Sequence, residues 1–333
     1  MSQQCSIALQ RDEVSGRSHE CPSYRAHRRH WFIGRHLLKE LPKRGYKIRA
    51  LLRRPTMLPP EASSAVVGDL AAPRNMSDAL AGVDAVIHSA GLAHDMSGLP
   101  EDDYRAINTE ATIGLARAAA RAGVRRFVFL SSIRAQSGPI ASEVLTEDME
   151  PRPTDAYGRS KLDAERGLAD VSIDWVAMRP VLVYGPGVKG NMAALVKLAA
   201  KPLPLPFRSL PGRRSLLSVD NLVVAVDTVL RADAPLRRPL IVAEPDALTI
   251  AEMITSLRSG LGRRPGLLPV PAPLLRYVFG MLGRAEAYER IAGSLMASAA
   301  ALTALGWAPP VATRDGLAAL VRTADQAVGT SGG

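Results

Sequence analysis

The sequence predicts an α/β fold built on a doubly wound parallel sheet, and three observations support this prediction. Helix and strand patterns alternate over about 150 residues, as they do when helices cover both faces of a parallel sheet. The strand patterns include "DAVIHSAG" and "RRFVFLSSI", whose continuous apolar runs predict strands buried on both faces. Small or polar residues end both runs, at the strand ends where such sheets place their active sites.

The first elements of this pattern follow one another from Phe32. Segment 32–45 is predicted to be a helix, because apolar residues recur on one face and Gly45 is typical of a helix end. These apolar residues are Ile33, Leu37, Leu38 and Leu41. Strands are expected at 46–54 and 64–70, and a short helix at 75–83.

The central elements are the most regular. Buried strands are expected at 84–91 and 125–133, and a third strand followed by a loop at 172–187. Long helices are expected between them, at 104–124 and 156–170.

The alternation loosens after Gly187. Proline-rich segments, "KPLPLP" and "LLPVPAP", separate helices expected at 250–261, 273–282 and 314–327. This pattern predicts a smaller, mixed substrate-binding portion over residues 186–326, after a nucleotide-binding domain over residues 32–185. Residues 327–333 are expected to be a disordered tail.

Composition excludes several classes of protein. The chain is 47% hydrophobic and 22% charged, which favours a globular domain over a disordered chain. It lacks a long apolar run and a signal pattern, so no transmembrane segment and a cytoplasmic location are expected. The net charge of +10 comes from scattered arginines, which does not favour nucleic-acid binding. Both cysteines, Cys5 and Cys21, precede Phe32, so neither a disulfide framework nor a cysteine metal site is expected.

The segment "AYGRSK" carries the strongest chemical signal. Tyr157 and Lys161 are four residues apart and share a helix face, where an ammonium is expected to lower the pKa of the phenol toward neutrality. Ser131 and Ser132 end the preceding buried strand, where a hydroxyl could hold the same substrate oxygen. Together they predict proton transfer at a substrate hydroxyl or carbonyl group.

These motifs resemble those of the extended short-chain dehydrogenase/reductases, in the NAD-dependent epimerase/dehydratase group. The resemblance runs from Phe32 to about Arg322 and implies a Rossmann-type sheet. It implies that Tyr157 is the acid/base, that Lys161 is its partner and a ligand of the cofactor ribose, and that Ser132 donates to the substrate oxygen. Asn108, in "INTEAT", matches an asparagine that supports the active-site helix; a plain helix polar residue is the alternative.

The resemblance also implies a nicotinamide cofactor. Asp69 and Leu70, in "GDL", match the adenine-contacting position, and Ala90 and Gly91 match the small residues over which the cofactor passes. Arg53, with Arg54 beside it, replaces the acidic residue that would hold the ribose of NAD, which favours NADP without excluding NAD. His88 and His94 are expected to serve strand packing and a loop, not a metal.

The C-terminal half resembles bacterial UDP-glucose 4-epimerase-like proteins, and among them 4-keto reductases that make N-acetylquinovosamine-type sugars. Asn191 and Arg214 match positions that hold the diphosphate of a UDP-sugar, a task that suits the guanidinium fork. The resemblance therefore implies chemistry at C4 of a nucleotide sugar, and leaves epimerase, 4-keto reductase and dehydratase open. It also implies a homodimer formed through the helices at 104–122 and 157–169. A sterol- or flavonoid-type dehydrogenase and a non-catalytic NAD(P)-sensing protein are the alternatives.

The family's first strand and glycine-rich loop are missing. Of that loop only Phe32, Ile33 and Gly34 remain, and Arg28 and Trp31 stand where glycines would let the backbone approach the pyrophosphate. The codons of residues 27–32, read one base later, can encode Thr-Gly-Ala-Thr-Gly. We therefore expect that residues 1–31 are an aberrant N-terminus produced by one missing base, that the first strand is absent or corrupted, and that cofactor binding is weak. A divergent natural N-terminus is the alternative.

Overall fold

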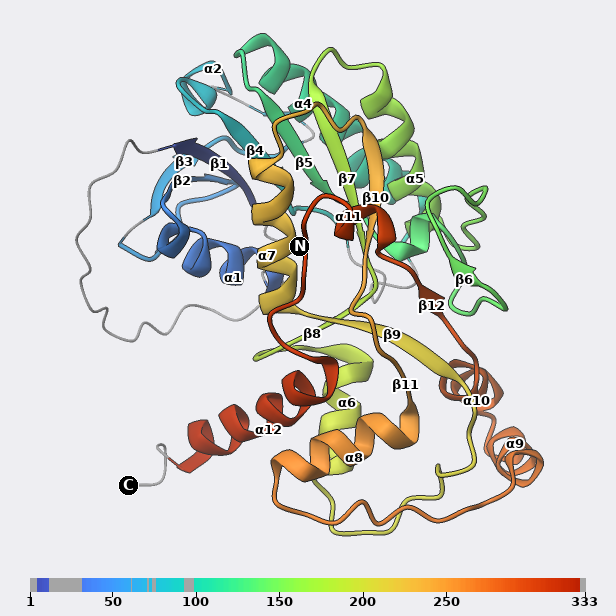
Figure 1. Ribbon diagram of the computed structural model, residues 1–333. Coiled ribbons are helices and arrows are strands. Elements are labelled where there is room, and N and C mark those ends of the chain that lie inside the picture. The colour runs from blue at the N-terminus through green and yellow to red at the C-terminus, as the bar shows by residue number, and fades with distance from the viewer. Residues whose placement is uncertain are drawn as a thin grey trace. The chain divides into compact units, whose positions relative to one another are not determined.

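A computed structural model describes residues 5–11, 32–60, 62–70, 72–73, 76–92 and 99–329. Its main sheet has seven strands in the order β10-β7-β5-β4-β1-β2-β3 (Figure 1). The pairs β2–β3, β4–β5 and β5–β7 are parallel, so the predicted α/β class with a mostly parallel sheet is confirmed. The strands are β1 Cys5–Arg11, β2 Tyr46–Leu52, β3 Ala62–Val66, β4 Ala85–His88, β5 Arg126–Leu130, β7 Asp174–Pro180 and β10 Arg238–Val242.

Helices cover the sheet because its central strands are apolar on both faces. Every residue of β4 and β5 is buried. On one face, alanine-rich α4 and the inner side of α5 join these strands in one hydrophobic core. Helices α1 and α7 lie on the other face (Figure 1). The helices associated with the sheet are α1 Phe32–Glu40, α2 Met76–Leu80, α3 Glu101–Tyr104, α4 Ala111–Arg121, α5 Ala156–Ala169 and α7 Val219–Arg231.

The centre of the sheet holds a strand that the sequence analysis did not anticipate. β1 lies between β2 and β4, where the family's first strand would lie, and its residues Ile7 and Leu9 are fully buried. It is antiparallel to both neighbours, with Cys5 paired to Leu52 and Leu9 paired to Ala85. The carboxyl end of β1 is therefore at the amino ends of β2 and β4. It does not lead directly into α1, as a glycine-rich loop would require.

Two expected elements are interrupted. The helix expected at 104–124 contains a π-helical turn, Arg105–Glu110, between α3 and α4. The strand expected at 172–187 divides into β7 of the main sheet and β8 Leu182–Tyr184, which pairs with β9 in a three-stranded sheet. π-helical turns insert one extra residue into a helix, often where a functional side chain must be re-aimed.

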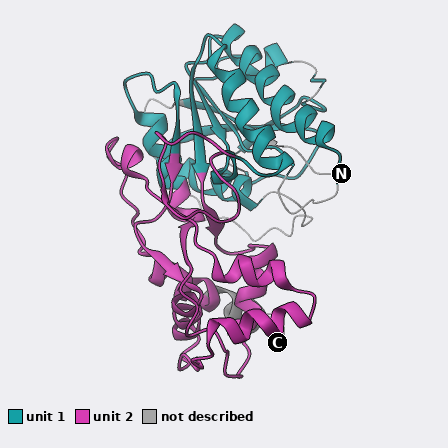
Figure 2. Cartoon of the chain, turned by 90° about the vertical axis from the view of Figure 1, so that its right-hand side faces the viewer, with its two compact units in different colours: residues 1–135, 153–179, 223–240 teal, residues 136–152, 180–222, 241–333 magenta. Residues whose placement is uncertain are grey.

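The chain divides into two compact units whose segments alternate along the sequence (Figure 2). Unit 1 comprises residues 1–135, 153–179 and 223–240, and contains most of the main sheet. Unit 2 comprises residues 136–152, 180–222 and 241–333, and has its own hydrophobic core. Its elements are β6 Val144–Leu145, β8, β9 Arg213–Ser218, β11 Ala247–Thr249, β12 Met296–Ala297, α6 Gly190–Ala199, α8 Ile250–Gly260, α9 Ala272–Met281, α10 Ala285–Ala292, α11 Ala300–Thr303 and α12 Thr313–Gly329.

Candidate active site

Two serines follow the carboxyl end of β5, and the structure gives them different environments. Ser131 is buried, and its hydroxyl donates to the carboxylate of Glu165 on α5. Ser132 keeps partial solvent exposure and interacts with the Tyr157 hydroxyl through a side-chain hydrogen bond. The Ser132 hydroxyl is thus the one beside the phenol, whereas the Ser131 hydroxyl is engaged within the core.

The N-terminus of α5 is fixed against the turn that follows β5. Asp155 caps the helix by accepting from the backbone N–H of Gly158 at 2.7 Å, and its carboxylate also pairs with Arg134. A Cβ atom on Gly158 would lie 2.3 Å from the Arg134 carbonyl oxygen, so no larger residue fits between the helix and the turn. This close approach brings Tyr157 beside Ser132.

The structure raises the pKa of Tyr157 to about 12, chiefly because its hydroxyl group is buried. The hydrogen bond with Ser132 and the charge of Arg134 oppose this rise. Lys161 Nζ lies 6.0 Å from the centre of the Tyr157 ring. The expected fall of the Tyr157 pKa toward neutrality is therefore not found in this arrangement, because desolvation of the phenolate outweighs every favourable interaction.

Lys161 lies deeper in unit 1 than its partner tyrosine. Its Nζ donates to the Leu130 carbonyl oxygen at 3.0 Å and lies 4.6 Å from the centre of the Phe129 ring. Burial lowers the pKa of Lys161 to about 8, and the nearby Glu165 carboxylate opposes that fall. The ammonium and the neutral amine of this lysine are thus close in free energy near neutral pH.

A buried ion pair lies in the core near Lys161. Glu165 on α5 and Arg179 on β7 have side chains that are 4% and 3% exposed, and they join through Nη2 and Oε2 at 2.5 Å. The Arg179 Nε also donates to Glu165, and Ser131 completes the cluster. This cluster was not predicted from the sequence, in which its only signal is the charged Arg179 inside the apolar run of β7.

Asn108 lies in the π-helical turn and is fully buried. Its side-chain oxygen accepts from the Leu92 backbone N–H at 2.7 Å, and its amide group donates to Ser160 Oγ at 3.0 Å. Ser160 precedes Lys161 on α5, so Asn108 joins the loop after β4 to the active-site helix. Asn108 therefore connects two segments of the chain, whereas a plain polar residue of a helix would contact only its own helix or solvent.

A chain of hydrogen bonds extends from Asn108 to the central strand. The Thr112 hydroxyl donates to the Asn108 carbonyl oxygen at 2.6 Å and lies 3.0 Å from His88 Nε2. Because the Thr112 proton is already used, His88 Nε2 must carry the hydrogen, and His88 Nδ1 accepts from Ser6 Oγ at 2.7 Å. Burial lowers the pKa of His88 to about 3, so this histidine is neutral.

The small residues after β4 lie beside this network. Ala90 is buried, and a Cβ atom on Gly91 would lie 2.8 Å from Asn108 Oδ1 and 3.3 Å from Lys161 Nζ. The Asn108 and Lys161 side chains can approach the backbone this closely because glycine has no Cβ atom. Gly34 is buried in the first turn of α1, near Ser89.

The expected adenosine-binding residues lie at the ends of β2 and β3. Arg53 and Asp69 form an ion pair at 2.8 Å, and Leu70 beside them is buried. Arg54 is exposed. Phe32 and Ile33 begin α1 and are partly buried. The structure thus places the residues expected to contact adenosine after the carboxyl ends of β2 and β3, and those expected near the nicotinamide after β4 and on α5.

The first strand and α1 are not arranged as a pyrophosphate-binding loop would require. The carboxyl end of β1 lies at the amino end of β4, whereas Gly34 of α1 lies near Ser89, which follows the carboxyl end of β4. Arg28, Trp31 and His94 lie outside the described residues. Among the described residues no cluster of histidine, cysteine and carboxylate side chains could hold a metal ion. No helix within the described ranges is long and apolar enough to cross a membrane.

The two expected diphosphate ligands belong to unit 2. Asn191 is exposed in the first turn of α6. Arg214 is partly exposed on β9, and its guanidinium donates to the carbonyl oxygens of Pro139 at 3.2 Å and Arg290 at 2.5 Å. Unit 1 brings Ser132, Tyr157, Lys161 and Asn108 together, and Asn191 and Arg214 belong to unit 2.

Comparison with known proteins identifies relatives along most of the chain. A family model described as "NAD dependent epimerase/dehydratase family" matches residues 31–242. A UDP-glucose 4-epimerase from Vibrio cholerae is 33% identical over 297 residues, which cover 86% of this chain and 90% of that protein. A ceramide reductase from Caulobacter vibrioides is 27% identical, with 73% of this chain and 71% of that protein covered.

Solved structures show the same architecture. MoeE5 in complex with UDP-glucose and NAD is 28% identical and aligns with a TM-score of 0.67, covering 89% of this chain and 96% of that one. The UDP-glucuronic acid 4-epimerase from Bacillus cereus, in complex with NAD, aligns with a TM-score of 0.62 at 20% identity. It covers 80% of this chain and 82% of its own, and at this identity the likeness concerns the fold alone.

Proposed function

Because this chain belongs to the NAD-dependent epimerase/dehydratase family, we propose that it acts at C4 of a UDP-sugar through Ser132, Tyr157 and Lys161. The observation that carries this proposal is the juxtaposition of Ser132 and the Tyr157 hydroxyl, with Lys161 behind them on the same helix. The similarity to a UDP-glucose 4-epimerase and to MoeE5, whose structure contains UDP-glucose, supports the substrate class.

The roles of the residues follow from their protonation states. Bound nicotinamide would exchange a hydride with C4 of the sugar. Tyr157, whose pKa is raised to about 12, is protonated at neutral pH, so it can donate a proton to a C4 carbonyl oxygen. The Ser132 hydroxyl can donate a second hydrogen bond to the same oxygen, which stabilises the negative charge that develops there. This protonation state favours 4-keto reduction over hydroxyl oxidation as the first reaction to test.

We assign the cofactor to the NAD(P) class, with a preference for NADP. Gly91, Ala90, Tyr157 and Lys161 would hold the nicotinamide riboside end. Arg53, Arg54, Asp69 and Leu70 would hold the adenosine end. The ion pair with Asp69 neutralises Arg53, so the exposed Arg54 is the main candidate for a 2′-phosphate. An Arg54→Ala variant should weaken NADP⁺ binding more than NAD⁺ binding, as measured by calorimetry; equal losses would contradict the preference.

The decisive experiment removes one oxygen atom. A Tyr157→Phe variant should lose more than about 99% of NAD(P)H-dependent turnover of a UDP-4-keto sugar, because proton donation contributes about 10²- to 10⁴-fold. It should bind the cofactor as the unaltered chain does. Tyr277→Phe, which alters an exposed tyrosine of unit 2, is the matched control and should leave turnover unchanged. Full turnover by Tyr157→Phe would disprove the assignment.

A second candidate function has a specific observation in its favour. Relatives named ceramide reductase and 3 beta-hydroxysteroid dehydrogenase match 73–74% of this chain at 27–28% identity. An enzyme of this kind would use the same Ser-Tyr-Lys chemistry on a lipid hydroxyl or ketone. Asn191 and Arg214 favour the nucleotide sugar instead, and parallel assays with a UDP-sugar and a 3-hydroxysteroid separate the two. A cofactor-sensing protein would turn over neither, although it would bind NAD(P).

We also propose that the protein is a homodimer formed through α4 and α5. These helices pack against each other on one face of the sheet. Light scattering of the purified chain tests this proposal, since a monomer across a wide concentration range would contradict it.

A further inference from the structure

Helix α9 of unit 2 exposes an apolar stripe. Leu274, Tyr277, Val278, Met281 and Leu282 are 53%, 66%, 41%, 73% and 66% exposed. They recur at spacings of three and four residues, which places them on one face of the helix and the turn that ends it. Five adjacent exposed apolar side chains are more than the scattered surface residues that soluble proteins normally tolerate.

The opposite face of α9 is anchored in unit 2. Leu275 is buried, and the Phe279 ring lies 5.9 Å from the ring of Tyr288 on α10. The Tyr288 hydroxyl donates to the Ala272 carbonyl oxygen at 3.1 Å. Because these contacts fix the helix, the exposed stripe is held in place on the surface of this unit.

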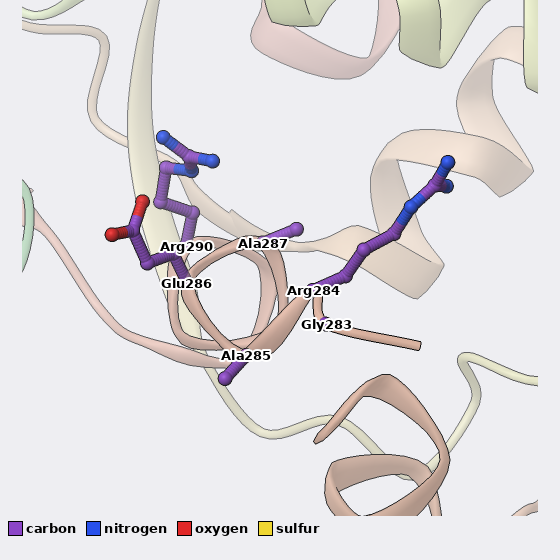
Figure 3. A pocket seen from close by; sticks show the side chains of 6 residues that line it. All are labelled: Gly283, Arg284, Ala285, Glu286, Ala287 and Arg290. Atoms are coloured by element: carbon purple, nitrogen blue, oxygen red, sulfur yellow. The ribbon is translucent and has the colours of Figure 1, made fainter. Parts of the chain in front are cut away.

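Positive charge borders the stripe. Residues 263–290 contain five arginines and two glutamates, and α9 itself carries one charged residue, Arg276. A hollow of about 450 Å³ lies directly after α9, at the start of α10, and is lined by Arg284, Arg290 and Glu286 among others. Figure 3 shows the side chains of Arg284 and Arg290 extending from this turn of the chain, with Glu286 beside Arg290.

We propose that α9 lies on the surface of an anionic lipid bilayer. The helix has 10 residues and spans about 15 Å, half of a hydrocarbon core, so it would lie in the interface and not cross it. Its apolar stripe would enter the boundary of the acyl chains, while Arg284 and Arg290 meet lipid phosphates. Arg276 is paired with Glu289 at 3.8 Å.

Charge complementarity selects this partner over a second copy of the chain. A symmetric dimer through α9 would bring two sets of the same arginines together, and like charges across an interface disfavour association. An anionic membrane surface instead supplies both the opposite charge and an apolar layer. The proposal is independent of the reaction assigned to unit 1, because it concerns no residue of the Ser-Tyr-Lys site.

Vesicle co-sedimentation of the full chain tests the proposal. The chain should bind vesicles of phosphatidylcholine with about 30% phosphatidylglycerol, and bind phosphatidylcholine alone at least about fivefold more weakly. Salt at about 0.5 M should reduce binding, since it screens the arginines. An Arg284→Gln variant should bind anionic vesicles several-fold more weakly, because each arginine near the surface contributes about fivefold.

The apolar contribution has its own variant and control. A Tyr277→Gln/Met281→Gln variant should bind at least about tenfold more weakly. Both side chains are exposed, so the variant should keep the circular dichroism spectrum and melting temperature of the unaltered chain. Met57→Gln, at a residue of unit 1 that is 71% exposed, is the control and should bind vesicles normally.

Three results would overturn the proposal. The first is an absence of binding to anionic vesicles. The second is binding that the Tyr277→Gln/Met281→Gln variant leaves unchanged. The third is a dimer, seen by light scattering, that this variant dissociates, because a second copy of the chain would then cover the stripe.

Discussion

At the scale of single residues, burial sets the protonation states of the two side chains that we propose carry the proton transfer. Tyr157 and Lys161 are both desolvated, and desolvation moves their pKa values in opposite directions, to about 12 and about 8. The phenol is therefore kept as a proton donor, while the lysine can approach neutrality. The spacing of two residues on a helix does not reveal this outcome, because it depends on the atoms that surround each group.

Gly158 provides a sharp test of the geometry that fixes Tyr157. A Gly158→Ala variant should lose about 1–3 kcal/mol of unfolding free energy and most of its turnover, because the new Cβ meets the Arg134 carbonyl oxygen. Gly114→Ala is the matched control: apart from its chain neighbours and the backbone of its own helix α4, no atom lies within 4 Å of its Cβ position, so alanine should stabilise the helix by about 0.5–1 kcal/mol. Urea unfolding measures both, and equal effects would contradict the account.

Glu165 provides a second test at this scale. Glu165→Gln leaves the Arg179 charge buried without a counter-charge, so the free energy of unfolding should fall by about 3 kcal/mol. Glu101→Gln removes one partner of the exposed pair with Arg159 and should leave the unfolding midpoint nearly unchanged. Unfolding of both variants at the same urea concentration would contradict a stabilising role of the buried pair.

At the scale of elements, a buried hydrogen-bonded chain links strands β1 and β4 to the π-helical turn and to α5. It runs from Ser6 through His88 and Thr112 to Asn108, and then to Ser160 on α5. Each polar group in it is satisfied by its neighbour, which is how a parallel sheet tolerates polar residues at its centre. The orientation of the active-site helix is thus coupled to a strand on the far side of β4.

The neutral state of His88 makes stability depend on pH. The His88 pKa falls from 6.5 to about 3 on folding, so the unfolded chain binds more protons between these values. The contribution is complete above pH 6.5 and is lost as the pH falls; about 2 kcal/mol should disappear between pH 7.5 and 5. In a His88→Gln variant this part of the pH dependence should vanish, as measured by urea unfolding at both pH values. An identical pH profile would contradict a neutral His88.

At the scale of the whole molecule, the chain combines family features from Phe32 onward with an N-terminus of another kind. The family match begins at residue 31, and β1 fills the central position of the sheet in the opposite direction. A chain in this arrangement lacks the direct turn from the first strand into α1 that would hold a pyrophosphate. Weak cofactor binding therefore remains our expectation.

Restoring the fingerprint tests this expectation directly. A chain in which residues 1–31 are replaced by an apolar parallel strand and Thr-Gly-Ala-Thr-Gly should bind NAD(P)H about tenfold more tightly or better. Cofactor fluorescence gives the affinities of both chains. Tight binding by the unaltered chain would refute the expectation. Sequencing of the gene from Ser15 to Arg35 is the accompanying check, since one additional base near Trp31 would restore the family frame.

The sequence by itself determined the fold class and the family, and it predicted the residues that we propose carry the chemistry. Buried parallel strands must be continuously apolar, and Tyr157 and Lys161 need only the local spacing of one helix. The resemblance to the family covered the same segments that the comparisons match. Such features depend on neighbours in the sequence, and neighbours in the sequence are visible without a structure.

Only the tertiary structure decided how those residues behave. The raised pKa of Tyr157, the direction of β1, and the cluster of Ser131, Glu165 and Arg179 all depend on contacts between segments distant in the chain. Desolvation and strand direction are properties of packing, and residues far apart in sequence create that packing. The exposed stripe of α9 also depends on packing. The sequence shows an apolar helix, and only the fold shows which face of that helix is left uncovered.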